Sequence, residues 1–104
     1  MFETIRNIFG LGPRMDIEAL MKQGAQVIDV RTPAEFKRGN IKGSVNLPLD
    51  RLQSQFHKIK KEKPVITCCR SGARSGVAKR MLKAHGYTEV YNGGGWVELK
   101  RKMQ

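Results

Sequence analysis

Residues 64–75, PVITCCRSGARS, decide the fold because they join a strand, a short loop and a helix in one stretch. The mostly β-branched run Val65–Cys68 follows a charged loop and predicts a buried strand. From Ser75 to His85, apolar side chains share one helical face and basic side chains the other, which predicts an amphipathic helix. The stretch therefore predicts a strand–loop–helix unit of an α/β protein.

Strands and helices alternate along the rest of the chain. Three further strands are predicted, at Ala25–Val30, Gly43–Leu47 and Glu89–Tyr91. Capping residues predict a helix capped by Asp16 over Ile17–Gln23, one capped by Thr32 that ends near Gly39, one capped by Asp50 that runs to Lys58, and a last one over Trp96–Lys102. This alternation predicts a mostly parallel sheet with helices on both faces, where ligands bind beyond the carboxyl ends of the strands.

A chain of 104 residues has room for one domain. Apolar residues at helical spacing predict a short helix in an N-terminal segment, residues 1–13, which ends in a break rich in glycine and proline. We expect the domain itself to span residues 14–104. No apolar run approaches the roughly 18 to 20 residues that a membrane span needs, so we expect no membrane partner.

The net charge of +11 predicts attraction for anions. The basic runs at residues 58–63 and 100–102 contain no aromatic side chains on which bases would stack, so we expect no nucleic-acid partner. The two cysteines are adjacent, which suits neither a disulfide framework nor a CxxC metal site, and no metal or cofactor is expected. Free thiols and the absence of a signal-like N-terminus predict a cytoplasmic protein.

Cys69 is the candidate nucleophile. It lies just past the predicted strand, where a short loop leads to a helix N-terminus and converging backbone N–H groups form an anion cradle. Such surroundings lower a cysteine pKa and hold an anionic substrate at the same time. The candidate substrate-binding residues are Arg70, Ser71, Gly72, Ala73, Arg74 and Ser75.

The loop residues are expected to differ in their roles. Gly72 allows the positive φ that turns the loop amides inward. We expect Arg74 to be held inward against carboxylates or carbonyls and Arg70 to point toward the entrance. Cys68, one residue earlier on the strand, faces the opposite side of the sheet and is expected to pack in the core, with a resolving thiol as the alternative.

Three residues before the loop are expected to support the site. Asp29 lies at the carboxyl end of a predicted strand, near the predicted site, and Arg31 and Glu35 have the spacing of a pair across the first helical turn. We expect these three residues to form a salt-bridge network that braces the cysteine loop.

Three motifs in this order resemble single-domain rhodaneses, the sulfurtransferases. The motifs are the loop at residues 69–75, the stretch DVRTPAEF–GNIKGSVNLP at 29–48, and the segments around Gly86-Tyr87 and Gly93–Trp96. The resemblance covers about residues 14–102. It implies a three-layer α/β fold with a five-stranded, mostly parallel sheet. It also implies that Cys69 takes up sulfane sulfur as a persulfide, from thiosulfate or another small anionic donor, and passes it to a thiol or protein acceptor.

Two departures from the family pattern and two alternative functions remain. Asn40 replaces the usual histidine of a Gly-His-Ile motif, and Cys68 replaces a larger apolar residue.

A sulfur carrier or docking module is the non-enzyme alternative. A phosphatase or arsenate reductase is the other alternative, but those relatives have five residues between cysteine and arginine, whereas four separate Cys69 from Arg74.

Overall fold

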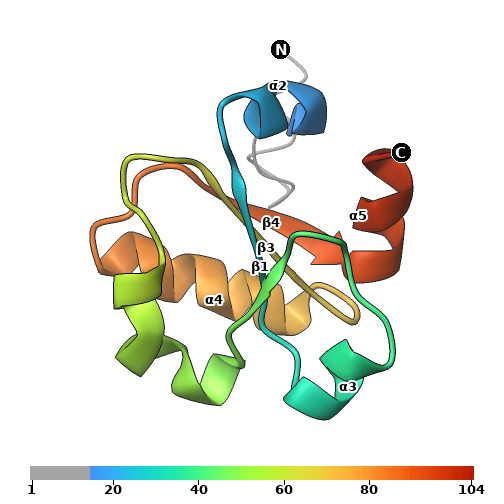
Figure 1. Ribbon diagram of the computed structural model, residues 1–104. Helices are drawn as coiled ribbons and strands as arrows, with labels where there is room; N and C mark the ends of the chain where they lie inside the picture. The colour runs from blue at the N-terminus through green and yellow to red at the C-terminus, as the bar shows by residue number, and fades with distance from the viewer. Residues whose placement is uncertain (1–14) are drawn as a thin grey trace.

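The computed structural model describes residues 15–104 (Figure 1), so the short helix predicted within residues 1–13 lies outside the described part. The elements in chain order are α2 (Ile17–Lys22), β1 (Gln26–Asp29), α3 (Pro33–Lys37), β2 (Val45–Asn46), the 3-10 helix η1 (Leu49–Lys58), β3 (Val65–Cys69), α4 (Ala73–Ala84), β4 (Val90–Gly95) and α5 (Trp96–Lys102).

The strands form one parallel sheet in the order β2-β1-β3-β4. These four strands are the ones that the residue patterns predicted. The prediction of five strands, which came from the family resemblance alone, is wrong for the described residues. Every other segment of residues 15–104 is a helix or a loop, so none is left to extend the sheet.

Helices cover both faces of the sheet, as predicted (Figure 1). Successive strand residues point to opposite faces, and two separate apolar clusters result. On one face, α4 and η1 pack on a cluster that includes Ile28, Val65, Cys69, Leu52 and Leu82. On the other face, α2 and α5 pack on a cluster that includes Val27, Ile66, Cys68, Leu20 and Leu99.

The caps of the first two helices match the prediction. Asp16 accepts a hydrogen bond from the Ala19 N–H, and Thr32 and Glu35 form a reciprocal capping box. The prediction that Asp50 caps the third helix is wrong. That segment is a 3-10 helix that begins at Leu49, after Pro48, and no side chain caps it.

The unit around the cysteine is tighter than the sequence predicted. Cys69 is the last residue of β3 rather than the first residue after it, and α4 begins at Ala73 rather than Ser75. Gly72 is the N-cap of α4 and has a φ of 103°, the positive value that was expected. Only three residues therefore lie between the strand and the helix.

Glycines of β4 allow the cysteine loop to lie directly against this strand. Cys69 pairs with Gly95 in the β3–β4 ladder, after a register irregularity that begins at Thr67. A Cβ atom on Gly95 would lie 2.8 Å from the Arg70 carbonyl oxygen. The end of β4 thus packs directly against the backbone of the loop.

We predict that Gly95→Ala destabilises the protein by about 1–3 kcal/mol, the usual cost of overpacking. The φ of Gly95 is −71°, which suits alanine, so the cost comes mainly from the contact with the Arg70 carbonyl. Urea denaturation measures the loss. Val97→Ala is the matched control because Val97 is 49% exposed in the adjoining helix and should shift stability by less than about 0.5 kcal/mol. Equal stability of the two variants would contradict the steric argument.

Candidate active site

The Cys69 sulfur lies where β3 meets the N-terminus of α4. Its Sγ atom accepts a hydrogen bond of 3.0 Å from the Gly72 N–H and lies 3.4 Å from the Ser75 hydroxyl oxygen. No side chain caps α4, since its N-cap is glycine. The first N–H groups of a helix have no partner within the helix, so at α4 they are available to the sulfur.

Two opposing effects act on the pKa of Cys69, which is only 1% exposed. Burial alone would raise the pKa of this thiol. Hydrogen bonds to the sulfur from the Ser75 side chain, and from the N–H groups of Ser75, Gly72 and Ser71, outweigh that effect and lower the pKa. The site therefore favours the nucleophilic thiolate although the residue is buried.

Asn92 belongs to this candidate site, although it was not among the predicted site residues. The Ser75 hydroxyl, which can donate its proton either to the sulfur or to this amide, lies 2.7 Å from Asn92 Oδ1, and the Asn92 amide donates a hydrogen bond of 3.1 Å to the Gly72 carbonyl. Asn92 comes from β4, far from the loop in sequence, and only the strand order brings it there. Its position directly before the glycine run was the one available signal.

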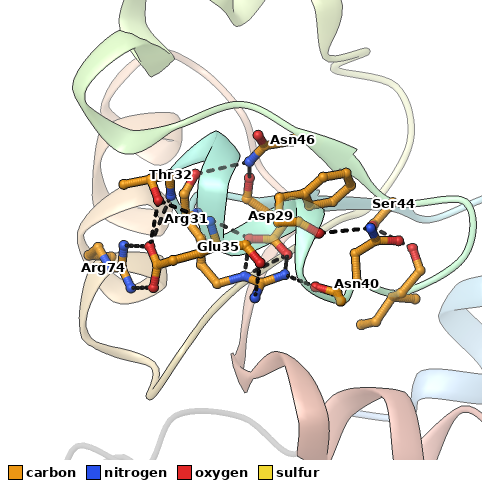
Figure 2. A network of polar contacts seen from close by, with 11 residues as sticks. Asp29, Arg31, Thr32, Glu35, Asn40, Ser44, Asn46 and Arg74 are labelled. Atoms are coloured by element: carbon orange, nitrogen blue, oxygen red, sulfur yellow. Dashed lines mark hydrogen bonds and ion pairs between the residues drawn. The ribbon is translucent and has the colours of Figure 1, made fainter.

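Arg74 turns inward and binds Glu35 of α3. Its two terminal nitrogens donate hydrogen bonds of 2.7 and 2.9 Å to the two carboxylate oxygens (Figure 2). The Arg74 guanidinium is the main reason that the pKa of Glu35 falls to about 2, and hydrogen bonding from Thr32 contributes as well. This ion pair joins α3 to the first turn of α4.

Arg31 does not pair with the Glu35 side chain, so that predicted pairing is wrong. Arg31 instead forms a buried ion pair of 2.7 Å with Asp29, and its other donors bind the carbonyls of Glu35 and Gly39 (Figure 2). Its guanidinium also lies 4.5 Å from the centre of the Trp96 ring. The side chain of Glu35 is thereby left for Arg74.

The remaining loop residues face solvent. Arg70, Ser71 and Ala73 are exposed, and the Arg70 side chain has no ion-pair partner among the described residues. The charge of Arg70 is therefore open to solvent beside the cysteine, whereas Ser71 offers its backbone N–H to Cys69.

Cys68 lies in the apolar cluster beneath α2 and α5, on the face opposite to Cys69. Burial, with a contribution from the nearby Asp29 carboxylate, raises the pKa of Cys68 to about 12. The two neighbouring thiols thus have opposite pKa shifts. Asn40, the other departure from the family pattern, donates a hydrogen bond of 2.9 Å to the Phe36 carbonyl at the end of α3.

Residues 15–104 offer neither a metal site nor a membrane span. Within them, no group of three or more histidine, cysteine, aspartate or glutamate side chains is arranged to hold a metal ion. No helix in the same range is both long and apolar enough to cross a membrane.

Comparison with known proteins identifies the family. Residues 15–102 match the family model of the rhodanese-like domain. The chain is 46% identical over 68 residues to the uncharacterised protein YqhL of Bacillus subtilis, covering 65% of this chain and 54% of that protein. It is 33% identical over 89 residues to the thiosulfate sulfurtransferase GlpE of Pseudomonas syringae, covering 86% and 84% of the two chains.

A solved structure agrees with this match. The structure described as rhodanese with anions from E. coli has a TM-score of 0.67 and 33% identity, and covers 71% of this chain and 89% of that one. The chain therefore belongs to the rhodanese-like family, a family that includes thiosulfate sulfurtransferases.

We predict that Glu35→Gln destabilises the protein by about 0.5–1 kcal/mol at pH 6, since the ion pair is partly exposed. The pKa of Glu35 is about 2 in the folded protein, against about 4.3 in an unfolded chain. The stabilisation is fully present above the unfolded value and is lost as pH falls toward 2. Urea denaturation at pH 6, 4 and 3 should show the gap between parent and variant closing.

The matched control is Glu98→Gln, which removes one partner of the more exposed ion pair with Arg101. This variant should stay within a few tenths of a kcal/mol of the parent at every pH. A gap for Glu35→Gln that is constant with pH would mean that the carboxylate charge does not stabilise the loop.

Proposed function

We propose that the protein is a sulfurtransferase that moves sulfane sulfur from thiosulfate or a persulfide donor to a thiophilic acceptor through a Cys69 persulfide. The observation that carries the proposal is the cradle of N–H and O–H donors around a buried sulfur whose pKa is lowered. Membership of a family that includes thiosulfate sulfurtransferases supports the same reaction.

The proposed first step forms a persulfide on Cys69. The Sγ thiolate attacks the outer sulfur of thiosulfate, the S–S bond of the donor breaks, and its electron pair leaves on sulfite. In the second step a nucleophile such as cyanide attacks the outer sulfur of the persulfide. The bond from that sulfur to Sγ breaks, the thiolate is restored, and thiocyanate leaves. A small thiol or a protein thiol would act as acceptor in the same way.

The loop residues have distinct roles in this proposal. The N–H groups of Ser71, Gly72 and Ser75 stabilise negative charge at the sulfur, as an oxyanion hole does for oxygen. Arg74 is a positioning residue, because its charge is bound to Glu35 and its planar fork holds the loop against α3. Asp29 holds Arg31, and Arg31 in turn binds the backbone carbonyl of Glu35. Arg70 attracts the anionic donor from solvent.

A sulfur carrier is the second candidate function. One relative, 27% identical, is named a putative sulfur carrier protein, YrkF of Bacillus subtilis. A carrier would accept sulfur on Cys69 from a protein persulfide but turn over thiosulfate poorly, so steady-state turnover with thiosulfate and cyanide separates the two functions. The cytoplasmic location and the domain boundary at residue 14 stay predictions.

We predict that incubation with thiosulfate adds the mass of one sulfur atom to the intact protein and that cyanide removes it. Cys69→Ser should gain no sulfur, since it lacks the thiolate. Intact-mass spectrometry makes the measurement. Cys68→Ala is the matched control, because its side chain lies on the other face of the sheet and most activity should remain. Sulfur that stays on Cys69→Ser, or maps to Cys68, would refute the assignment.

We predict that Arg70→Ala raises the KM for thiosulfate by about twofold to fivefold and leaves kcat nearly unchanged, since an exposed charge attracts substrate and transition state alike. Arg70→Lys should restore most of the effect, and added salt should mimic the alanine variant. Lys22→Ala serves as the control, because it also removes one exposed positive charge. Lys22 ends α2 and lies shortly before the start of β1, whereas Cys69 lies at the end of β3. If the KM for thiosulfate changes neither with salt nor with Arg70→Ala, Arg70 does not attract the donor and the backbone N–H groups alone bind the anion.

A further inference from the structure

Asn92 holds the hydroxyl that faces the Cys69 sulfur. The orientation of its amide is fixed from two sides: Oδ1 accepts a hydrogen bond of 2.9 Å from the Gly94 N–H, and Nδ2 donates one to the Gly72 carbonyl. An amide oxygen can only accept a hydrogen bond. In the 2.7 Å contact between Ser75 Oγ and Asn92 Oδ1, the serine must therefore be the donor.

The Ser75 hydroxyl has one proton and two acceptors within reach. When the proton points to Asn92, the 3.4 Å contact with Cys69 requires the sulfur to donate, so the cysteine is a neutral thiol. When the cysteine is a thiolate, the sulfur can only accept, and the Ser75 hydroxyl can bind it only by turning its proton away from Asn92. The two arrangements exclude each other because a hydroxyl has one proton.

We infer that Asn92 is a positioning residue that competes with the Cys69 sulfur for the Ser75 proton. The inference rests on the proposed function, in which negative charge leaves Sγ each time the persulfide forms. At that moment the Ser75 hydroxyl returns to Asn92 Oδ1 and keeps a hydrogen bond. Ser75 and Asn92 together thus stabilise the thiolate, but weakly enough that negative charge can still leave the sulfur.

Gly76 supports this arrangement. A Cβ atom at this position would lie 3.2 Å from the Asn92 amide nitrogen, closer than most side chains come. A hydrogen atom there leaves room for the amide between the first turn of α4 and β4. Thr67 further fixes this turn, since its hydroxyl donates a hydrogen bond of 2.9 Å to the Ser75 carbonyl.

The test measures the pKa of Cys69 from the pH dependence of its alkylation by iodoacetamide, in a Cys68→Ala background that leaves one thiol. Asn92→Asp supplies a stronger acceptor and should hold the Ser75 proton away from the sulfur, which raises the pKa of Cys69. Its negative charge also raises this pKa directly. Repeating the substitution in a Ser75→Ala background removes the shared proton and isolates the direct effect.

We expect Asn92→Asp to raise the pKa of Cys69 by at least about half a pH unit more when Ser75 is present than when it is alanine. Equal shifts in the two backgrounds would overturn the inference and reduce Asn92 to a loop anchor.

Asn92→Ala is the second variant, and circular dichroism checks that each chain folds. Asn92→Ala removes the acceptor that competes with the sulfur. The change that it causes in the pKa of Cys69 should therefore be more negative when Ser75 is present than in the Ser75→Ala background. An equal change in the two backgrounds, or a more positive one with Ser75 present, would also overturn the inference.

Alkylation needs no sulfur transfer, so the two proposals fail separately. A protein that gains no sulfur from thiosulfate would refute the proposed function while the coupling between residues 75 and 92 stayed measurable. A normal persulfide with no coupling would refute the inference alone.

Discussion

The buried ion pair between Asp29 and Arg31 is the interaction on which the site depends. Such a pair is costly to bury unless its hydrogen-bonding groups are satisfied. Here Asp29 accepts bonds from the Arg31 side chain and backbone, and Arg31 also binds two carbonyls in and after α3. The pair therefore fixes the chain from the end of β1 to Gly39. With α3 fixed in this way, Glu35 presents its carboxylate to Arg74.

The direction in which a strand residue points decides which of the two thiols has the lowered pKa. Cys68 and Cys69 are neighbours in β3, and both are almost fully buried. Cys68 faces apolar side chains and a carboxylate, which raise its pKa, whereas Cys69 faces the N-terminal turn of α4, which lowers its pKa. Burial alone thus does not make a cysteine inert. The number of donors that face the sulfur determines the sign of the shift.

Local signals predicted much of this structure, and long-range contacts account for what was missed. The strand–loop–helix unit, the Thr32 capping box and the positive φ of Gly72 depend on neighbouring residues and were predictable. The pairing of Glu35 with Arg74 spans 39 residues, and that of Ser75 with Asn92 spans 17. Spacing on one helix favoured Arg31 as the partner of Glu35, because no local pattern shows that Asp29 already binds this arginine. The incorrect prediction of a fifth strand came from the family resemblance alone.

The charge of the chain is distributed in a way that composition hides. The net charge is +11, yet two arginines near the cysteine are neutralised by Asp29 and Glu35. In the proposed reaction, attraction for an anion at the sulfur would then come from backbone N–H groups, the dipole of α4 and the exposed Arg70. Backbone donors are fixed by the fold and need no ordering when a charge arrives. Because Arg74 and Arg31 hold that backbone in place, we expect their contribution to anion binding to be geometric and to persist at salt concentrations that screen Arg70.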